Sequence, residues 1–268
     1  MNAQMKEKVP VSVVIVAQDE ERTIGDVLEA MKPLATELIV VDSGSTDDTV
    51  KIAVSHGAKV CHQKWLGYAA QKNFAIGLAS CEWILSLDAD EVVTQSLCNE
   101  IIDVLGNGVP ANVAGFKLPR VLFIGGTAVR RGGFYPDAQL RLFRKDKGRF
   151  KDRIVHEAME VDGDVIKLKN DINHFSYETE AEFARAMDKY ARLSAQHYLK
   201  NRNSLWQRSC INEFLHPGWT FFYRHIIRLG FLDNPLCLRL NILYADYVRK
   251  KISYLRLLHS NKELPPTN

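Results

Sequence analysis

The stretch Trp83-Ile-Leu-Ser-Leu-Asp-Ala-Asp-Glu91 decides the fold class of this 268-residue chain. Its first five residues form an apolar run that suits a buried strand, and Asp88 and Asp90 follow directly. Ligands of open α/β sheets bind beyond the carboxyl ends of the strands. The stretch therefore predicts an α/β protein in which these carboxylates lie at a binding site.

Strand and helix patterns alternate through the first hundred residues. Apolar runs predict strands over 11–16, 37–41, 58–61 and 83–87, and amphipathic segments predict helices over 23–31, 45–56, 67–79 and 94–105. Acidic residues, among them Glu20 and Asp42, also follow the first two strands. This alternation is typical of parallel βαβ units with right-handed crossovers. We therefore expect a mostly parallel, Rossmann-like sheet flanked by helices, with the acidic strand ends at one edge.

Two local patterns describe the helices in more detail. Ser45-Thr-Asp-Asp48 has the spacing of a capping box and predicts that the second helix opens there. Ala70, Phe74 and Leu78 recur at helical spacing and predict one apolar face of the third helix.

The pattern changes after residue 110. Residues 115–175 combine Gly, Arg and short alternating segments, which indicates mixed sheet with long loops. Residues 178–200 have helical periodicity, and residues 205–258 predict two or three more helices. We expect a domain over residues 1–177 that carries the site and an α-helical C-terminal region over 178–268.

The composition limits the class of protein. The apolar fraction of 46% and the charged fraction of 25% are ordinary for a globular protein, and a net charge of +3 is too small to imply a nucleic-acid partner. Five cysteines without a CxxC pair disfavour zinc and a disulfide framework, and favour a reducing compartment. The polar first ten residues and the lack of a run of ~18 apolar residues favour a cytoplasmic protein.

The C-terminal region differs in charge from the rest. Residues 201–268 hold ten Lys and Arg against four Asp and Glu, a balance of +6, whereas the first 200 residues carry 25 − 28 = −3. Residues 219–258 mix these bases with aromatic and aliphatic side chains. Such helices either pack on a neighbouring domain or lie peripherally on a membrane face, and packing is the favoured interpretation.

The carboxylates after the fourth strand are candidate metal ligands. Two carboxylates two residues apart at a strand end can hold one hard divalent cation, with water and phosphate oxygens completing the shell, although such residues also cap helices. Asp42 could accept a hydrogen bond from a nucleobase N–H. Neither GxGxxG nor GxxxxGK[ST] occurs, which disfavours a dinucleotide cofactor and a kinase-type ATP site.

Several segments carry a resemblance in their order. They are Gln18-Asp-Glu-Glu21, Val40-Val-Asp-Ser-Gly-Ser-Thr-Asp47, Trp65-Leu-Gly-Tyr68, Gln71-Lys-Asn73 and Leu87-Asp-Ala-Asp-Glu91. Together they resemble glycosyltransferase family 2, which has the GT-A fold. Later segments, such as Gly132-Gly-Phe-Tyr-Pro-Asp137, Val155-His-Glu157 and His174-Phe-Ser-Tyr177, resemble its branch of lipopolysaccharide-core and other envelope-glycan transferases. This branch usually has Asn before its first acidic pair, whereas Gln18-Asp19 stands here. This difference leaves open which of Asp19, Glu20 and Glu21 faces the nucleotide.

The resemblance, which covers about residues 11–255, implies a nucleotide-sugar donor, most often a UDP-sugar, and Mg²⁺ or Mn²⁺. The residues that it assigns to the donor are Ala17, Glu20, Asp42, Gln71, Lys72, Asp88, Ala89 and Asp90. Asp90 is expected to ligate the metal directly. By helical pattern alone, Lys72 could equally lie on a solvated helix face.

Inverting transfer needs one base to deprotonate the attacking acceptor hydroxyl. Asp137 is the leading candidate, because the resemblance places an acidic residue near the acceptor there, and Glu157 is the rival. His156 could complete the metal shell or contact a phosphate, and His174 is a weaker candidate. Arg130, Arg131, Arg141 and Arg144 form a basic band suited to a diphosphate or an anionic acceptor.

We therefore expect an inverting, metal-dependent glycosyltransferase that moves a sugar from a UDP-hexose to a cell-envelope glycan or lipid-linked acceptor, such as lipopolysaccharide core. One alternative is a phosphotransferase or phosphatase that uses Asp88 and Asp90 as nucleophile and acid, although such enzymes carry this pair on the first strand. Another is a non-catalytic nucleotide-sugar-binding scaffold.

Overall fold

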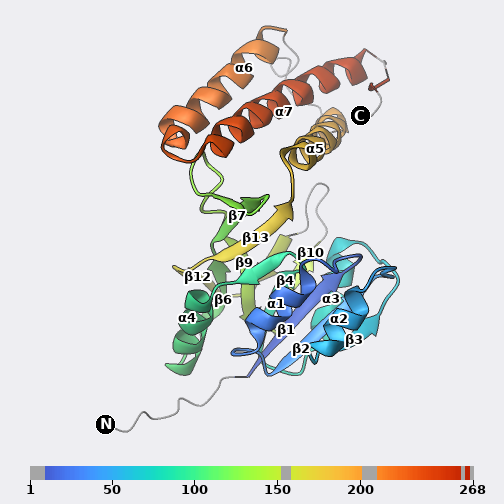
Figure 1. Cartoon of the computed structure of the whole chain (residues 1–268), viewed down its shortest axis with the longest axis vertical. Helices are drawn as coiled ribbons and strands as arrows, with labels where there is room; N and C mark the ends of the chain where they lie inside the picture. Colours follow the sequence, from blue (N-terminus) through green and yellow to red (C-terminus); the bar gives the residue numbers. More distant parts are fainter. Residues whose placement is uncertain (1–9, 152–157, 201–209, 261–262, 266–268) are drawn as a thin grey trace. The chain divides into compact units, whose positions relative to one another are not determined.

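The computed structural model describes residues 10–151, 158–200, 210–260 and 263–265. The chain forms two compact units (Figure 1). Unit 1 comprises residues 1–121 and 137–175, and unit 2 comprises residues 122–136 and 176–268. The predicted domain boundary at residue 177 places residues 122–136 in the first domain, whereas the structure groups them with unit 2. The boundary stays a prediction.

A seven-stranded sheet forms the centre of unit 1. Its order is β12-β6-β9-β4-β1-β2-β3. The strands β1, β2, β3 and β4 run parallel to one another, as expected, whereas β9 is antiparallel to both β4 and β6. The strand bounds are β1 (Val11–Ala17), β2 (Glu37–Asp42), β3 (Lys59–His62), β4 (Trp83–Asp88), β6 (Val113–Leu118), β9 (Gln139–Arg144) and β12 (Asp164–Lys167).

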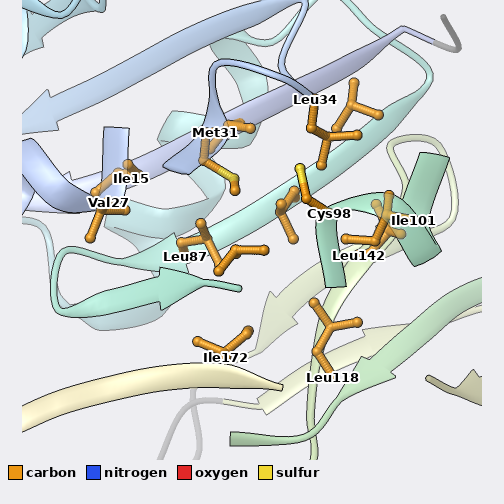
Figure 2. Close-up of a cluster of buried hydrophobic side chains, with 14 of the residues drawn as sticks. Ile15, Val27, Met31, Leu34, Leu87, Cys98, Ile101, Leu118, Leu142 and Ile172 are labelled. Carbon is orange, nitrogen blue, oxygen red and sulfur yellow. The ribbon is translucent and has the colours of Figure 1, made fainter. Parts of the chain in front are cut away.

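Two hydrophobic clusters cover opposite faces of this sheet, because successive strand residues point to opposite sides. Val13 and Ile15 of β1 belong to the larger cluster, with side chains of α1 and α4 (Figure 2). Val14, between them, belongs to the second cluster, with side chains of α3. The helices are α1 (Ile24–Met31), α2 (Thr49–Ser55), α3 (Tyr68–Leu78) and α4 (Gln95–Gly106).

Smaller strands complete unit 1. The short strand β5 (Glu91–Val93) follows β4 and pairs antiparallel with β13 (Ile172–Tyr177, whose last two residues belong to unit 2), and β10 (Gly148–Lys151) pairs antiparallel with β11 (Ala158–Val161). The pairing of β13 with β5 matters for the site, because it sets His174 opposite Glu91.

One helix prediction is wrong in its starting residue. A second is incomplete, since Phe74 and Leu78 of the predicted apolar face pack against the second cluster but other residues of α3 are more buried. The helix expected from Ser45 begins at Thr49, and no side-chain bond from Asp48 caps it. Instead, the Asp47 carboxylate accepts the backbone N–H of Thr49 at 3.0 Å. The buried residues of α3 are Ala69, Gln71, Lys72, Ala75 and Ile76, whereas Ala70, Phe74 and Leu78 are half-buried.

Unit 2 contains the hairpin of β7 (Arg120–Ile124, whose first two residues belong to unit 1) with β8 (Thr127–Val129), and the C-terminal helices. The helices are α5 (Glu180–Lys200), α6 (Cys210–Phe222), a π-helical turn (Tyr223–Ile227), a 3₁₀ turn (Gly230–Leu232) and α7 (Pro235–His259). The Asn234 side chain caps α7 by accepting the backbone N–H of Cys237 at 3.1 Å. Within the described residues, no helix is long and apolar enough to cross a membrane.

Candidate active site

The candidate site lies where the order of the strands reverses in unit 1. The chain leaves β1 to build β2 and β3 on one side, and then adds β4 on the other side of β1. Such a switch point opens a crevice beyond the carboxyl ends of the two strands. A cavity of about 610 Å³ lies there, lined by Val16, Ala17, Gln18, Glu20, Ser43, Trp65, Tyr68, Lys72, Asp88, Ala89, Asp90 and His174.

Asp88, at the end of β4, is held between two cations. One carboxylate oxygen is 2.8 Å from the Lys72 ammonium, and the other accepts a hydrogen bond from the Arg141 guanidinium. Burial of Asp88 opposes ionisation, but the charges of Arg141 and Lys72 outweigh it and hold the pKa of Asp88 well below its usual range. The Lys72 side chain is largely buried, so the solvated-face interpretation is wrong.

The ion pairs continue from Asp88 into the interior. Glu91, with 0% exposure, lies 2.7 Å from Arg141 and 2.6 Å from Arg120. Arg120 in turn binds the Asp137 carboxylate. Positive and negative side chains thus alternate from Lys72 at the cavity to Asp137. We call this the ionic chain: Lys72, Asp88, Arg141, Glu91, Arg120 and Asp137.

Asp90 faces a different environment from Asp88. Its carboxylate lies 3.3 Å from Nε2 of His174. Burial and, next, the negative charge of Asp90 raise the pKa of Glu20 to about 7. The cavity therefore contains two carboxylates, on the ends of β1 and β4, that repel each other.

These groups have the chemistry of a divalent-cation site. Carboxylate oxygens suit Mg²⁺ and Mn²⁺, and imidazole is a common transition-metal ligand. Among the described residues, no three His, Cys, Asp or Glu side chains form a ready-made metal cluster. A cation at Asp90 would thus need further oxygens, which a diphosphate and water can supply.

The segment after β1 is clamped to the loop after β2. Asp19, at φ 56°, accepts the backbone N–H of Thr46 at 2.8 Å, and Glu21 accepts that of Asp48 at 3.0 Å. Gln18 and Glu20 line the cavity instead. The alternation answers which of the three acids faces the cavity: it is Glu20, because its two neighbours are bonded to the loop.

Asp42 and Gln71 support the cavity from behind its lining. Asp42 accepts the backbone N–H groups of Gly44 and Ser45 at 3.1 and 3.0 Å. Burial opposes ionisation of Asp42, but hydrogen bonds with the side chain and backbone of Ser45, with His62 and with Gly44 outweigh it and lower the pKa of Asp42. Gln71, fully buried, donates to Ser43 Oγ at 3.1 Å and accepts from Leu66 N at 3.2 Å. These bonds fix the loop residues that border the cavity.

An aromatic pair forms one wall. Trp65 and Tyr68 pack edge-to-face with ring centroids 4.8 Å apart, and both line the cavity. Both residues belong to the segment Trp65-Leu-Gly-Tyr68, which carries part of the resemblance, but they were not predicted as site residues. Val16, Gln18 and Ser43 were also not predicted, although Gln18 and Ser43 stand in segments that carry the resemblance.

The structure brings six of the expected donor and metal residues to the cavity: Ala17, Glu20, Lys72, Asp88, Ala89 and Asp90. Asp42 and Gln71 lie behind the lining, and Asp137 lies at the far end of the ionic chain. His156 and Glu157 lie outside the described residues. In the basic band, Arg141 belongs to the ionic chain, whereas Arg144 pairs with Glu82.

Comparison with known families identifies the class of protein. The model of the family described as Glycosyl transferase family 2 matches residues 12–159, more than half of the chain. The chain therefore belongs to this family, which confirms the resemblance, and it is a glycosyltransferase.

Relatives with assigned names agree with this class. An uncharacterised glycosyltransferase of Rickettsia typhi is 29% identical over 231 residues, 83% of this chain and 78% of the relative. The lipopolysaccharide core biosynthesis glycosyltransferase LpsC of Rhizobium meliloti is 28% identical over 201 residues, 72% of this chain and 73% of the relative. Among solved structures, the mannosyltransferase PcManGT of Pyrobaculum calidifontis, in complex with GDP-Man and Mn²⁺, has a TM-score of 0.56 at 13% identity and covers 91% of this chain and 86% of its own. That likeness confirms the GT-A fold.

Proposed function

We propose that this protein is an inverting hexosyltransferase that uses a UDP-hexose and transfers the sugar to a hydroxyl of a cell-envelope glycan or lipid-linked acceptor, such as lipopolysaccharide core. The observation that carries the proposal is the switch-point cavity, which joins Asp88, Asp90 and Lys72 to an aromatic wall. A nucleoside diphosphate has the matching parts: an aromatic base and an anionic diphosphate. The relationship to LpsC supports the acceptor class.

The donor would lie along the cavity. Ala17 and Glu20 border the end expected to hold uridine, and Asp42 shapes the turn beside it. The Lys72 ammonium, which pairs with Asp88, would also attract the diphosphate, because a diphosphate bound in the cavity would lie within reach of it. Its buried position strengthens that attraction, since the local dielectric is low.

A divalent cation, Mg²⁺ or Mn²⁺, would be held by Asp90, with His174 and Glu20 beside it. When bound, it supplies Lewis-acid stabilisation of the negative charge on the departing diphosphate. The neutral form of Glu20 would lose its proton as the cation binds, because a nearby positive charge lowers a carboxyl pKa. His156, which was expected to complete the metal shell or contact a phosphate, lies outside the described residues, and its role stays a prediction.

The base is proposed to be Asp137, with Glu157 as the rival. Burial would raise the pKa of Asp137, but Arg120 and Gln139 outweigh it and hold the pKa below its usual range. Asp137 is therefore ionised and able to accept a proton, although a low pKa weakens a general base. The contribution expected from Asp137 is accordingly at the low end for such a group.

The deciding experiment is a thermal-stability screen of the full chain with UDP-, GDP- and dTDP-sugars in Mn²⁺, followed by product analysis with lipopolysaccharide-core acceptors. A nucleotide sugar at 100 times its Kd should add about 2.7 kcal/mol to the free energy of unfolding. Stabilisation without transfer or donor hydrolysis would support the scaffold alternative. A phosphoenzyme on Asp88 would support the phosphotransferase alternative, but the Lys72 and Arg141 pairs reduce the nucleophilicity of that carboxylate.

The proposed place of work is the cytoplasm. The sequence basis is the odd cysteine count, and the four cysteines whose side chains are described, Cys61, Cys81, Cys98 and Cys237, are free thiols. An acceptor carried on a lipid would then be reached at the inner membrane face.

A further inference from the structure

Unit 2 exposes large apolar side chains over one continuous segment of sequence. Phe214 is 75% exposed, Trp219 60%, Leu232 56% and Phe231 51%. Six further residues of the segment 214–232 are exposed large hydrophobics: Leu215, Phe222, Tyr223, Ile226, Ile227 and Leu229. We call this segment the apolar surface. Monomeric soluble proteins rarely expose apolar patches of more than a few hundred Å², and larger ones mark interaction sites.

The exposure is not a consequence of a loosely placed segment. Gly230 is buried so closely against α7 that an added Cβ would lie 2.6 Å from Nδ2 of Asn241. Arg224 lies over the rings of Phe134 and Tyr244, and it donates to Asn241 at 3.2 Å. The inner side of the segment is therefore seated on α7, while its outer side presents aromatic and aliphatic groups.

The charge pattern of the apolar surface is one-sided. The segment 214–232 contains Arg224, Arg228, His216 and His225 but no Asp or Glu. Arg228 is exposed within it. Trp and Tyr side chains with adjoining bases are typical of helices that lie in a membrane interface, where the rings enter the headgroup region and the cations meet anionic lipids.

The basic residues farther along α7 do not serve this purpose. Arg249 pairs with Asp246 at 2.7 Å, and Lys250 lies 3.2 Å from Asp188. Lys251 lies over the Tyr198 ring, and burial lowers its pKa. These three cations are therefore engaged within unit 2.

We propose that the apolar surface of unit 2 docks on the surface of a lipid bilayer, with Trp219, Phe231 and Leu232 entering the interface and Arg228 meeting anionic headgroups. The inference deepens the proposed function, because it names the surface that would bring a lipid-linked acceptor within reach. It does not depend on the donor chemistry, since the docking residues and the switch-point cavity belong to different units.

The test compares vesicle co-sedimentation of the full chain with that of the variant Trp219→Ser/Phe231→Ser/Leu232→Ser. The vesicles are phosphatidylcholine alone or with phosphatidylglycerol. Removing three exposed apolar side chains should lower the partition coefficient by about tenfold or more. The matched control is Val54→Ser/Ile166→Ser, which removes two exposed apolar side chains of unit 1 and should bind vesicles as the wild type does.

A second measurement covers the case in which the triple variant fails to fold. Brominated lipid should quench wild-type tryptophan fluorescence, and Trp219→Phe should remove most of that quenching. Binding that rises with phosphatidylglycerol and falls with salt supports the proposal.

The proposal is overturned if wild-type protein does not bind either kind of vesicle at low salt, or if the triple variant binds as well as the wild type. It is also overturned if the wild type is a dimer that does not bind vesicles and the triple variant is a monomer, because the occupant is then a second copy. Nucleotide-sugar stabilisation should be the same in all variants, so its absence would instead argue against the proposed function.

Discussion

The switch-point cavity of unit 1 and the apolar surface of unit 2 place their charged and apolar groups in opposite ways. In unit 1 the apolar residues are buried on both faces of the sheet, and the carboxylates Asp88 and Asp90 line the cavity. In unit 2 the cations of α7 are paired or stacked, and the apolar side chains of the segment 214–232 are exposed. A cavity with localised charge suits a small charged ligand, whereas an exposed apolar surface suits an extended partner such as a lipid bilayer.

The largest expected effect comes from Asp90. Asp90→Ala should lower kcat by at least about 10³, because it removes the proposed metal ligand, and Lewis-acid stabilisation amounts to several kcal/mol. Wild-type turnover should likewise disappear in excess chelator and return with Mn²⁺ or Mg²⁺. The measurement is sugar transfer at saturating donor, together with a thermal-unfolding curve that shows the variant is folded.

The control for Asp90 is Asp26→Ala, which removes an exposed carboxylate from α1. Vesicle binding should be unchanged in both variants, which would show that the metal site of unit 1 and the docking surface of unit 2 act independently. Full activity of Asp90→Ala, or full wild-type activity in chelator, would contradict metal-assisted departure of the diphosphate.

The second effect concerns the stability of unit 1. Glu91→Gln should lower the free energy of unfolding by about 3–5 kcal/mol, because it removes the buried negative charge that pairs with both Arg120 and Arg141. Urea unfolding measures the change. Asp48→Asn, which breaks the exposed pair with Lys51, should have a far smaller effect, and an equal loss in both would show that burial of the ionic chain does not matter.

The third effect tests the base. Asp137→Asn should lower kcat by about 10², with donor affinity unchanged, because Asp137 is not part of the cavity lining. Glu157→Gln is the paired variant, assayed for transfer at saturating donor. If Glu157→Gln loses this activity and Asp137→Asn keeps it, the roles are exchanged, and Asp137 is then a positioning residue that anchors Arg120.

The fold of unit 1 was predictable because its signals are local and repeated. Alternating apolar runs located β1, β2, β3 and β4 to within two residues, and the acidic residues after the first, second and fourth runs indicated the edge that carries the site. The start of α2 was missed because Asp47, rather than Ser45, bonds to Thr49. Pattern analysis identifies a residue type that can cap a helix, but the packing of the loop decides which residue does so.

The ionic chain and the apolar surface were not predictable from the sequence. Arg120, Glu91 and Asp137 come from separate segments, and only the tertiary fold brings them together. Likewise, helical periodicity could not decide which side of α3 is buried, because Lys72 is buried through its pair with Asp88. In unit 2, mixed aromatic and basic residues fitted both packing, which was the favoured interpretation, and membrane contact. The exposure of the side chains distinguishes the inner side of the segment 214–232 from its outer side.

The smallest expected effect is a pH dependence of unit 1 that comes from Glu20. The pKa of Glu20 is raised to about 7 from 4.5, so between these values the folded state binds a proton that the unfolded state has released. Stability contributed by the protonated group is complete below pH 4.5 and is lost as pH rises through 7.

Glu20→Gln cannot ionise, so its free energy of unfolding should rise relative to that of the wild type by on the order of 1–2 kcal/mol between pH 4.5 and 8, after allowance for solvent screening. Urea titrations at pH 4.5, 6, 7 and 8 without divalent cations measure this gain. Parallel pH profiles for the two proteins would mean that burial and Asp90 do not perturb Glu20. With Mn²⁺ present the gain should shrink, because a cation beside Asp90 favours the ionised form of Glu20 in the wild type and has no such group to act on in the variant.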